Sequence, residues 1–341
     1  MTPALSILIV TYNSRADLER CLPTIWAQSF TDLEVIVVDN HGGDGVAEWL
    51  QTHHPAVRLF RNPVNSGYAG GNNLGLRQAR GRWVLLLNPD TELRPGCLDT
   101  LMQTARAHPD AFITPKLLNG DGRTINACGN VMHYTGITTC RGLNQPADTY
   151  QGLEPVPLLS GAALLAPLTG LWQLNGFDER YFMYFEDTDM SLRARQQGIP
   201  LWCQADAEIV HHYTLRLSPG KFYYLERNRL LTLLKLFSGA TLRALLPALL
   251  LTELATWAYA LRGPAYLRAR WRGYVYLWRQ YGNLREESRQ LRQIARQPDW
   301  HLLHGSLVAL PVGQVAPGRI GQWLGAVMTR LYAWLRPAAL R

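Results

Sequence analysis

Short apolar runs rich in β-branched residues alternate with longer helical patterns through the first 120 residues. Buried strands are predicted over residues 5–14, the last of which form a polar loop, and over residues 34–40, 57–60, 82–90 and 111–118. Helices are predicted over residues 15–28, 46–53, 69–80 and 96–107. Continuously apolar strands separated by helices are typical of a mainly parallel sheet that is covered on both faces. We therefore expect an α/β fold here.

The pattern is less regular between residues 121 and 213. Residues 121–156 are rich in Gly and Thr and have no clear period, which predicts a hairpin or an excursion from the sheet. Helical patterns return at residues 167–174 and 187–197, and Gly198 fits the C-cap of the second helix. Residues 199–213 are predicted to form one or two further strands.

Helices dominate the chain after residue 221. A helix is predicted over residues 223–237, and the 18 residues 244–261 follow with Glu253 as their one charged side chain. A membrane-spanning helix needs about 20 predominantly apolar residues. Residues 244–261 are therefore a borderline case, and both Pro247 and Glu253 argue against spanning.

Two apolar stripes in the last 80 residues have arginines beside them. The first comprises Leu267, Trp271, Tyr274, Val275, Trp278 and Tyr281, with Arg268, Arg272 and Arg279 next to it. The second comprises Trp323, Leu324, Val327, Met328, Leu331, Trp334 and Leu335, with Arg330 and Arg336 nearby. Trp and Arg at a helix edge are typical of helices that lie in the plane of a membrane. The alternative is that these helices pack on the preceding part of the chain or on a second subunit.

The basic character of the chain is confined to its C-terminal part. The formal net charge is +8 over 341 residues, yet residues 262–341 hold 13 Arg, no Lys and three acids, a net charge of +10. Such a segment favours an anionic partner, either a nucleic acid or a membrane surface. Because its aromatic residues form continuous apolar faces, we expect an anionic membrane surface and no nucleic acid.

The cysteines and the N-terminus bear on localisation. The five cysteines stand far apart, their number is odd, and no pair has C-x-x-C spacing, so a reducing compartment is expected. The N-terminus lacks a basic segment, and the apolar run at residues 5–10 is too short for a signal peptide. We expect a cytoplasmic protein that is peripheral on the inner face of the cell membrane.

Polar groups follow three of the predicted strands. They are Thr11, Tyr12 and Asn13 after the first, Asp39 and Asn40 after the second, and Asn88, Pro89 and Asp90 after the fourth. In open α/β sheets, ligands bind beyond the carboxyl ends of the strands. The segment "NPVNSGYAGGNNLG" (62–75) opens a helix, and its glycines allow a diphosphate to approach the backbone. An ordinary turn with a helix cap would explain that segment equally well.

Candidate metal ligands stand at strand ends. Asp90 in "LLLNPDTEL" can hold a hard divalent cation, although "NPDTEL" could instead begin a helix. His211 and His212 end a strand-like run, and adjacent strand residues point to opposite faces, so at most one of them reaches a given metal.

Three acids end the apolar run "YFMYFEDTDM": Glu186, Asp187 and Asp189. Acids in the first turn of a helix cap free amides and suit the positive end of the helix dipole. Alternatively, one acid acts as a base and the others orient it. Asp189 precedes Arg193 by four residues, which favours an ion pair along the helix.

Eight pieces of the sequence, in order, resemble the inverting family 2 glycosyltransferases, particularly the rhamnosyltransferase-like branch. They are "SILIVTYN", "VIVVDN", "NSGYAGGNN", "LLLNPDTEL", "SGAALLAP", "GFDERYFMYFEDTDMSLRARQQG", "VHH" and "YYLERN", between about residues 5 and 235. The resemblance implies a nucleotide-binding α/β fold of the GT-A type, a divalent ion on the donor diphosphate, and one carboxylate base without a covalent intermediate.

The resemblance also assigns roles to residues. It places Thr11, Tyr12, Asn13 and Asp39 around the nucleoside, Asn65, Gly70, Gly71 and Asn73 along the diphosphate and ribose, and Asn88, Ser160 and Gly161 at the donor sugar. It makes Asp90 and His211 the ligands of Mn²⁺ or Mg²⁺, and Asp187 the catalytic base with Glu186 beside it. Asp178 and Arg227 would contact the acceptor.

The expected organisation is a GT-A catalytic domain over residues 1–235, followed by a helical, basic region over residues 236–341 that associates with membranes or mediates homo-oligomerisation. The expected reaction moves a sugar, such as the deoxyhexose rhamnose, from a dTDP- or UDP-sugar to a lipid-linked or cell-surface glycan acceptor. The alternative is a catalytically degenerate scaffold protein of a polysaccharide assembly complex.

Overall fold

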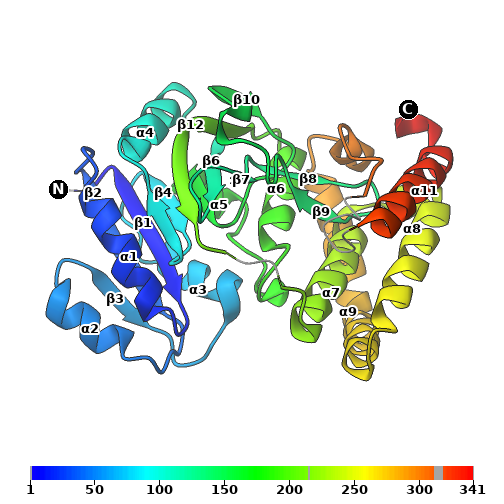
Figure 1. The fold of residues 1–341 in the computed structure, drawn as a ribbon, viewed down its shortest axis with the longest axis horizontal. Helices are drawn as coiled ribbons and strands as arrows, with labels where there is room; N and C mark the ends of the chain where they lie inside the picture. Colours follow the sequence, from blue (N-terminus) through cyan, green and yellow to red (C-terminus); the bar gives the residue numbers. More distant parts are fainter. Residues whose placement is uncertain (1, 214–215, 311–317, 341) are drawn as a thin grey trace. The chain divides into compact units, whose positions relative to one another are not determined.

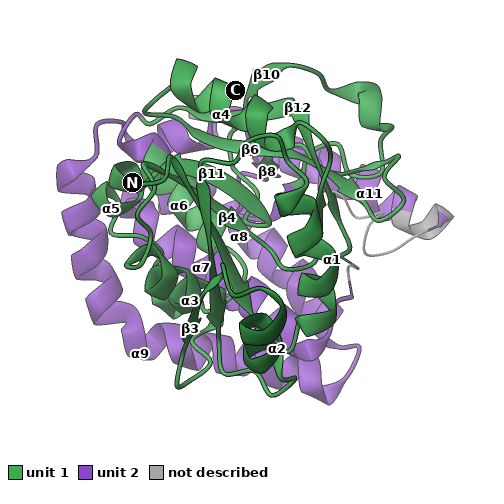
Figure 2. Ribbon diagram, turned by 90° about the vertical axis from the view of Figure 1, so that its left-hand side faces the viewer, with its two compact units in different colours: residues 1–130, 140–194, 199–215 green, residues 131–139, 195–198, 216–341 purple. Residues whose placement is uncertain are grey.

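The computed structural model describes residues 2–213, 216–310 and 318–340 (Figure 1). They form two compact units, coloured separately in Figure 2. Unit 1 comprises residues 1–130, 140–194 and 199–215, and unit 2 comprises residues 131–139, 195–198 and 216–341. The predicted domain boundary after residue 235 falls close to Leu236, the end of the first long helix of unit 2. The division into a catalytic domain and a membrane-associating or oligomerising region stays a prediction.

Unit 1 contains a ten-stranded sheet in the order β10-β12-β6-β11-β4-β1-β2-β3, with β5 beside β12 and β7 beside β6. The strands β1 (Leu5–Thr11), β2 (Leu33–Asp39), β3 (Arg58–Arg61) and β4 (Trp83–Leu87) are parallel. β6 (Phe112–Asn119) and β12 (Leu201–His211) are also parallel to each other, whereas β11 (Ala163–Pro167) is antiparallel to its neighbours. The predicted mainly parallel α/β fold is confirmed.

Helices cover both faces of this sheet because its strands are apolar on both sides. Leu5, Ile7 and Ile9 pack with α1 (Arg15–Trp26), α2 (Val46–His53) and α4 (Cys97–Ala107). Leu8, Ile36 and Val38 pack with α3 (Gly67–Leu76), α5 (Leu168–Gln173) and the part of α6 (Glu186–Gln196) that belongs to unit 1. A Cβ on Gly75 would lie 2.1 Å from Leu8 Cδ1, so the close packing of α3 on β1 requires glycine.

The irregular region between residues 121 and 156 forms several short elements. They are β7 (Ile125–Ala127), β8 (Asn130–Met132), β9 (Thr138–Cys140), the 3₁₀ turn η1 (Ala147–Thr149) and β10 (Leu153–Pro155), and β8 and β9 form a separate pair. Residues 199–213 contain the single strand β12, whose register shifts between Gln204 and Glu208. Thr91–Leu93 form the strand β5 against β12, so the helix start considered for "NPDTEL" is wrong.

Unit 2 is mainly helical. Its elements after residue 216 are α7 (Pro219–Leu236), α8 (Gly239–Ala260), α9 (Pro264–Ile294), η3 (Asp299–Leu303), α11 (Arg319–Leu335) and η4 (Ala338–Leu340). By length and composition alone, α8 is the one helix in the described part of the chain that could cross a membrane. On α9, Trp271, Trp278 and Tyr281 are exposed as predicted, whereas the Tyr274 hydroxyl is hydrogen-bonded within the unit.

Candidate active site

The carboxyl ends of β1 and β2 place the first group of predicted residues side by side. Thr11 and Asp39 are partners in the sheet register. The loop after β2 is tied back to both strand ends, because Gly42 N donates to Asp39 Oδ1 at 2.9 Å and Gly43 N donates to Asn13 Oδ1 at 2.7 Å. Tyr12 is 52% exposed at the same edge and presents an aromatic ring to solvent. The arrangement combines a ring for stacking with a carboxylate acceptor.

The side-chain amide of Asn40 fixes the Gly-rich segment beside these strand ends through several hydrogen bonds. Asn40 Oδ1 accepts from Asn62 Nδ2 at 2.8 Å and from Ser66 N at 3.2 Å. Asn40 Nδ2 donates to Asn65 Oδ1 at 3.1 Å and to Gly67 O at 2.9 Å. Asn65 is therefore held at the start of α3 by Asn40, a residue that was noticed in the sequence only as a strand-end polar group.

Three predicted donor-binding residues on α3 have packing contacts in the structure. A Cβ on Gly71 would lie 2.5 Å from Val10 Cγ1, so this glycine allows α3 to approach β1. Gly70 leaves no room for a Cβ either. Asn73 donates to Phe177 O and accepts from Phe177 N, both at 2.9 Å, which fixes the loop containing Asp178 to α3. Their contacts with a donor stay predictions.

Asp90 and His211 are brought together although 121 positions separate them in the sequence. The pairing of His211 with Thr91 places the end of β12 beside Asp90. His211 Nε2 lies 3.3 Å from Asp90 Oδ1, and neither atom has a hydrogen-bond partner although both are buried. Burial raises the pKa of Asp90, but the contacts with His211, a backbone hydrogen bond and His212 together lower that pKa below its usual value.

Two neighbouring side chains fix the orientation of the His211 ring. Its Nδ1 lies 3.1 Å from Asn126 Oδ1, and its ring stacks on Tyr213 with centroids 5.4 Å apart. A proton on Nδ1 would satisfy Asn126 and leave Nε2 with a free lone pair toward Asp90. His212 points away to Glu92, at 2.6 Å, as expected for adjacent strand residues.

The two facing atoms fit a divalent cation. A carboxylate and an imidazole are ordinary ligands of Mn²⁺, and each has an unsatisfied atom aimed at the other. No group of three or more His, Cys, Asp or Glu residues suited to a metal occurs in the described ranges. The remaining ligands of a cation at this position would therefore come largely from water or a bound diphosphate.

The acid pair lies at the start of α6. Asp187 Oδ2 accepts from Gly161 N at 2.9 Å, Asp187 Oδ1 accepts from Thr188 N at 2.7 Å, and Asn130 Nδ2 lies 3.5 Å from Oδ2. Burial raises the pKa of both carboxyl groups, and the charge of Asp187 raises that of Glu186 further. A carboxyl group with a raised pKa is suited to accept a proton near neutral pH.

Tyr68 connects the Gly-rich helix to this acid pair. Its hydroxyl donates to Gly161 O at 2.5 Å, and Gly161 N in turn holds Asp187. Burial, and then the charges of Glu186 and Asp187, raise the pKa of Tyr68 well above its usual value, so the hydroxyl stays protonated as a donor. Ser160, which is buried, precedes this contact. The segment proposed for the donor sugar thus adjoins the proposed base.

The aromatic residues before the acids have an unusual backbone. Phe182, Tyr184 and Phe185 have φ angles of 64°, 65° and 71°, in the left-handed region that bulky residues seldom adopt. Such conformations cost of order 1–3 kcal/mol each and gather at functional sites. Asp189 is buried and accepts from Arg193 Nε at 2.7 Å, which confirms the ion pair expected along the helix.

The two residues predicted to contact the acceptor lie in different units. In unit 1, Asp178 accepts from Arg180 Nε at 2.8 Å and from Arg180 N, which caps the turn η2 (Glu179–Tyr181). In unit 2, the Arg227 guanidinium lies over Tyr276 at 4.6 Å from the ring centroid, and its Nε donates to Asn228. Both acceptor contacts stay predictions.

Unsatisfied buried polar atoms gather among these residues. Eleven such side-chain atoms occur in the described residues, and five belong to this set: Thr11 Oγ1, Asp90 Oδ1, Asn130 Oδ1, Glu186 Oε2 and His211 Nε2. Buried polar groups in proteins are nearly always hydrogen-bonded, so a cluster of exceptions calls for an explanation. A polar ligand at this edge of the sheet supplies one. Asn126 and Asn130, both in the irregular region, were missed from the sequence because an isolated Asn carries no motif.

Comparison with known proteins identifies relatives of this chain. The family model described as "Glycosyl transferase family 2" matches residues 6–128. The chain is 30% identical over 236 residues to the N-acetylglucosaminyl-diphospho-decaprenol L-rhamnosyltransferase of Mycobacterium tuberculosis, an alignment covering 62% of this chain and 77% of that relative.

Two solved structures share the fold. One is TarS 1–349 of S. aureus in complex with UDP-GlcNAc, with a TM-score of 0.56 and 18% identity over 78% of this chain and 79% of that one. The other is GalNAc-T7 with UDP, GalNAc and Mn²⁺, with a TM-score of 0.58 and 16% identity over 70% of this chain and 49% of that one. At these identities the likeness concerns the fold.

Proposed function

Because the chain belongs to the family 2 glycosyltransferases, we propose that it moves a sugar from a dTDP- or UDP-sugar to a lipid-linked or cell-surface glycan, with inversion at the anomeric carbon. A deoxyhexose such as rhamnose is the proposed sugar, supported by the name of the mycobacterial relative. The single observation that carries the proposal is the set of five unsatisfied buried atoms. It includes Glu186 Oε2, next to the proposed base Asp187, and the facing atoms of Asp90 and His211.

The proposed reaction needs one base. Asp187 takes the proton of an acceptor hydroxyl while the hydroxyl oxygen attacks the anomeric carbon from the face opposite the nucleotide. Gly161 and Asn130 hold one carboxylate oxygen of Asp187 and so orient it. Burial raises the pKa of Asp187, and burial together with the charge of Asp187 raises that of the neighbouring Glu186. No residue is required to form a covalent intermediate.

The donor would lie along the carboxyl edge of the sheet. Asp39 accepts the N3–H of a uracil or thymine, and Tyr12 offers an exposed ring to the base. Asp90 and His211 would hold a divalent cation, which when bound offsets the charge of the diphosphate leaving group. Asn126 keeps the His211 ring in the orientation that this contact needs.

The metal pair gives the test of donor binding. Asp90→Ala and His211→Ala are each expected to abolish the Mn²⁺-dependent part of dTDP or UDP affinity, because each removes one of two protein ligands. Asn126→Ala is expected to weaken Mn²⁺ binding about 10- to 100-fold, because the His211 ring loses the contact that orients it. Titration calorimetry with and without Mn²⁺ measures these effects. His212→Ala is the matched control, since its ring points to Glu92 instead. Persistence of the Mn²⁺ enhancement in both ligand variants would place the cation elsewhere.

The acid pair predicts the pH dependence of transfer. Asp187 must be ionised to accept a proton, and burial raises its pKa above the ordinary carboxyl range. The value of kcat/KM should therefore fall as pH decreases through that raised pKa, at a higher pH than for an exposed aspartate. A pH–rate profile checks this. A profile that stays flat down to the ordinary Asp pKa of about 3.9 would contradict the assignment.

A peripheral location on the inner face of the cell membrane is part of the proposal. Its support is the net charge of +10 in residues 262–341, together with the exposed Trp271, Trp278, Trp323 and Trp334. Arginines near an anionic surface and Trp side chains at the interface both favour this location. A lipid-linked acceptor would be available in the same plane.

A further inference from the structure

Helix α8 has one side that is apolar and exposed along almost its whole length. Leu246, Leu250 and Leu254, spaced four residues apart, are 49%, 54% and 69% exposed, and Leu261 just beyond the helix is 74% exposed. Residues spaced in this way lie on one face of a helix. Between Arg243 and Arg262 this face carries no charge. Large exposed apolar surfaces of this kind mark sites of interaction.

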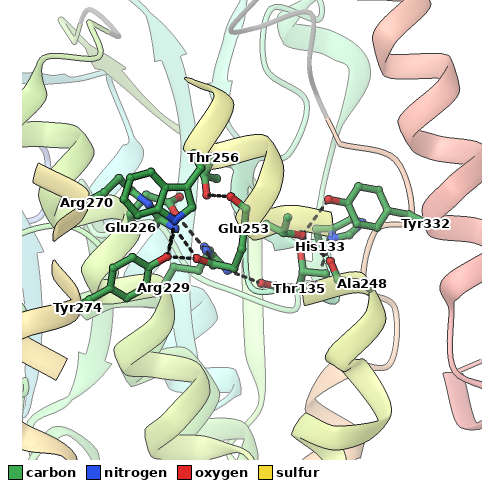
Figure 3. A network of polar contacts seen from close by, with 12 residues as sticks. His133, Thr135, Glu226, Arg229, Ala248, Glu253, Thr256, Arg270, Tyr274 and Tyr332 are labelled. Carbon is green, nitrogen blue, oxygen red and sulfur yellow. Dashed lines mark hydrogen bonds and ion pairs between the residues drawn. The ribbon is translucent and has the colours of Figure 1, made fainter. Parts of the chain in front are cut away.

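At one edge of this leucine side, α8 is anchored by charges (Figure 3). Glu253 is paired with Arg229 of α7 and Arg270 of α9. Glu226 completes the network, because its carboxylate lies 2.9 Å from Arg229 and 2.6 Å from Arg270. The Tyr274 hydroxyl also donates to Glu253. These contacts account for the one acid of this apolar helix, and they attach α8 to α7 and α9.

A second contact holds the side of α8 that faces away from the leucines. Thr252, fully buried, lies 2.8 Å from the Tyr332 hydroxyl of α11, and Tyr332 O accepts from the Tyr134 hydroxyl at 2.7 Å. Thr252, with the buried Leu245 and Ala248, thus lies on the side of the helix that packs inside unit 2. The leucines face away from that side, and about half or more of each is exposed.

This attachment decides between the ways in which α8 could meet a membrane. Spanning would carry two arginines and two glutamates of the network into the hydrocarbon layer, where ionised groups are costly. A helix lying in the interface needs only one apolar side for the lipid. The exposed leucine side of α8 meets that need, while Thr252 and the charge network hold the helix on unit 2.

Charge decides between a bilayer and a second copy of the chain. Arg268, Arg272 and Arg279 are exposed on α9 of the same unit, next to Trp271 and Trp278. A symmetric dimer of two units that both carry the net charge of +10 of residues 262–341 would bring like charges together, which is unfavourable. Anionic headgroups instead attract them.

We infer that α8 lies in the plane of an anionic lipid bilayer, with its leucine side among the acyl chains and its Thr252 side held by unit 2. The inference rests on the peripheral location proposed above and identifies the surface that enters the lipid. It makes α8, rather than the arginine-rich tail alone, the membrane-inserting element.

The test is co-sedimentation of the full-length protein with phosphatidylcholine vesicles, with and without phosphatidylglycerol. The wild-type protein should bind the mixed vesicles, less strongly in about 1 M than in about 0.1 M salt but still measurably, because salt screens the arginines and not the leucines. Leu250→Glu/Leu254→Glu should weaken binding about 100-fold, because each leucine gains free energy when its apolar surface moves from water into the acyl chains. Leu246→Glu/Leu261→Glu is a second pair on the same side and should act alike.

Matched controls distinguish the loss of the membrane-binding surface from misfolding and from the loss of donor binding. Trp26→Glu makes the same kind of change at an exposed apolar position of unit 1 and should bind vesicles as the wild type does. Far-UV circular dichroism and dTDP or UDP affinity should be unchanged in both leucine pairs. Alkaline carbonate should release the wild-type protein from the vesicles, as expected for an in-plane helix.

Four results would overturn the inference. Retention after carbonate treatment would show a spanning helix. Unchanged binding by both leucine pairs would place the inserting surface elsewhere. A dimer in solution that the leucine pairs dissociate would identify a second copy as the partner. A protein that ignores every vesicle but binds the donor nucleotide would overturn both this inference and the peripheral location, while the proposed transfer reaction would stand.

Discussion

Asp187→Asn is expected to lower the rate of sugar transfer by about 10²- to 10⁴-fold, the usual effect of losing a general base. Nucleotide affinity should stay close to that of the wild type, because Asp187 lies at the start of α6 and not at the strand ends that carry Tyr12 and Asp39. The amide keeps the acceptor oxygen for Gly161 N, so the local fold should survive. Steady-state kinetics with the donor and a prenyl-linked acceptor measure the effect.

Glu186→Gln is the matched control for this variant. It removes the neighbouring carboxyl group but leaves the proposed base in place, so most of the turnover should remain. The acidic limb of its pH–rate profile should stay close to that of the wild type, because burial and the charge of Asp187 raise the pKa of Glu186 and keep it protonated while Asp187 ionises. If instead Glu186→Gln abolishes transfer and Asp187→Asn does not, the base is Glu186 and the assignment is wrong.

Arg229→Ala is expected to destabilise the protein by about 3–5 kcal/mol, the cost of removing one partner from a buried ion-pair network. The Arg229 side chain is 1% exposed and pairs with both Glu226 and Glu253. Its loss leaves the two carboxylates with Arg270 as their remaining cation in the network (Figure 3). Urea denaturation measures the change in the free energy of unfolding.

Arg289→Ala is the control for the network. Arg289 pairs with Glu286 on the exposed part of α9, and the two side chains are 57% and 55% exposed. Exposed pairs contribute about 0–1 kcal/mol, so this variant should unfold almost as the wild type does. Equal losses for Arg229→Ala and Arg289→Ala would show that the buried network does not hold α7, α8 and α9 together.

The elements that sequence periodicity predicted well have strong local patterns. The helix at Val46–His53 has the predicted bounds, and the strands of the parallel half of the sheet lie where continuous apolar runs placed them. By contrast, β11 (Ala163–Pro167) and β5 (Thr91–Leu93) were not predicted. Both are short, and each is defined by pairing with a strand that is distant in the sequence. Such pairing leaves no periodic signal in the strand itself.

The same difference applies to the site. Strand-end residues such as Asp39 and Asp90 could be predicted because the carboxyl edge of a parallel sheet is a known place for ligands. Asn126 could not, because it contacts His211 across 85 positions and lies in a segment without a clear period. The left-handed conformations of Phe182, Tyr184 and Phe185 are likewise invisible in a run of ordinary aromatic residues. Long-range contacts and backbone strain appear only in the folded chain.

Thermal and chemical unfolding with a panel of dTDP-, UDP- and GDP-sugars, with and without Mn²⁺, tests the central claim most directly. That claim is a metal-assisted nucleotide-sugar site at the carboxyl edge of the sheet. One dTDP- or UDP-sugar, at about 100 times its dissociation constant, should stabilise the protein by about 2.7 kcal/mol. The stabilisation should require Mn²⁺ and should be lost in Asp90→Ala. Stabilisation by none of these donors, or equal stabilisation without Mn²⁺ and in Asp90→Ala, would contradict the account.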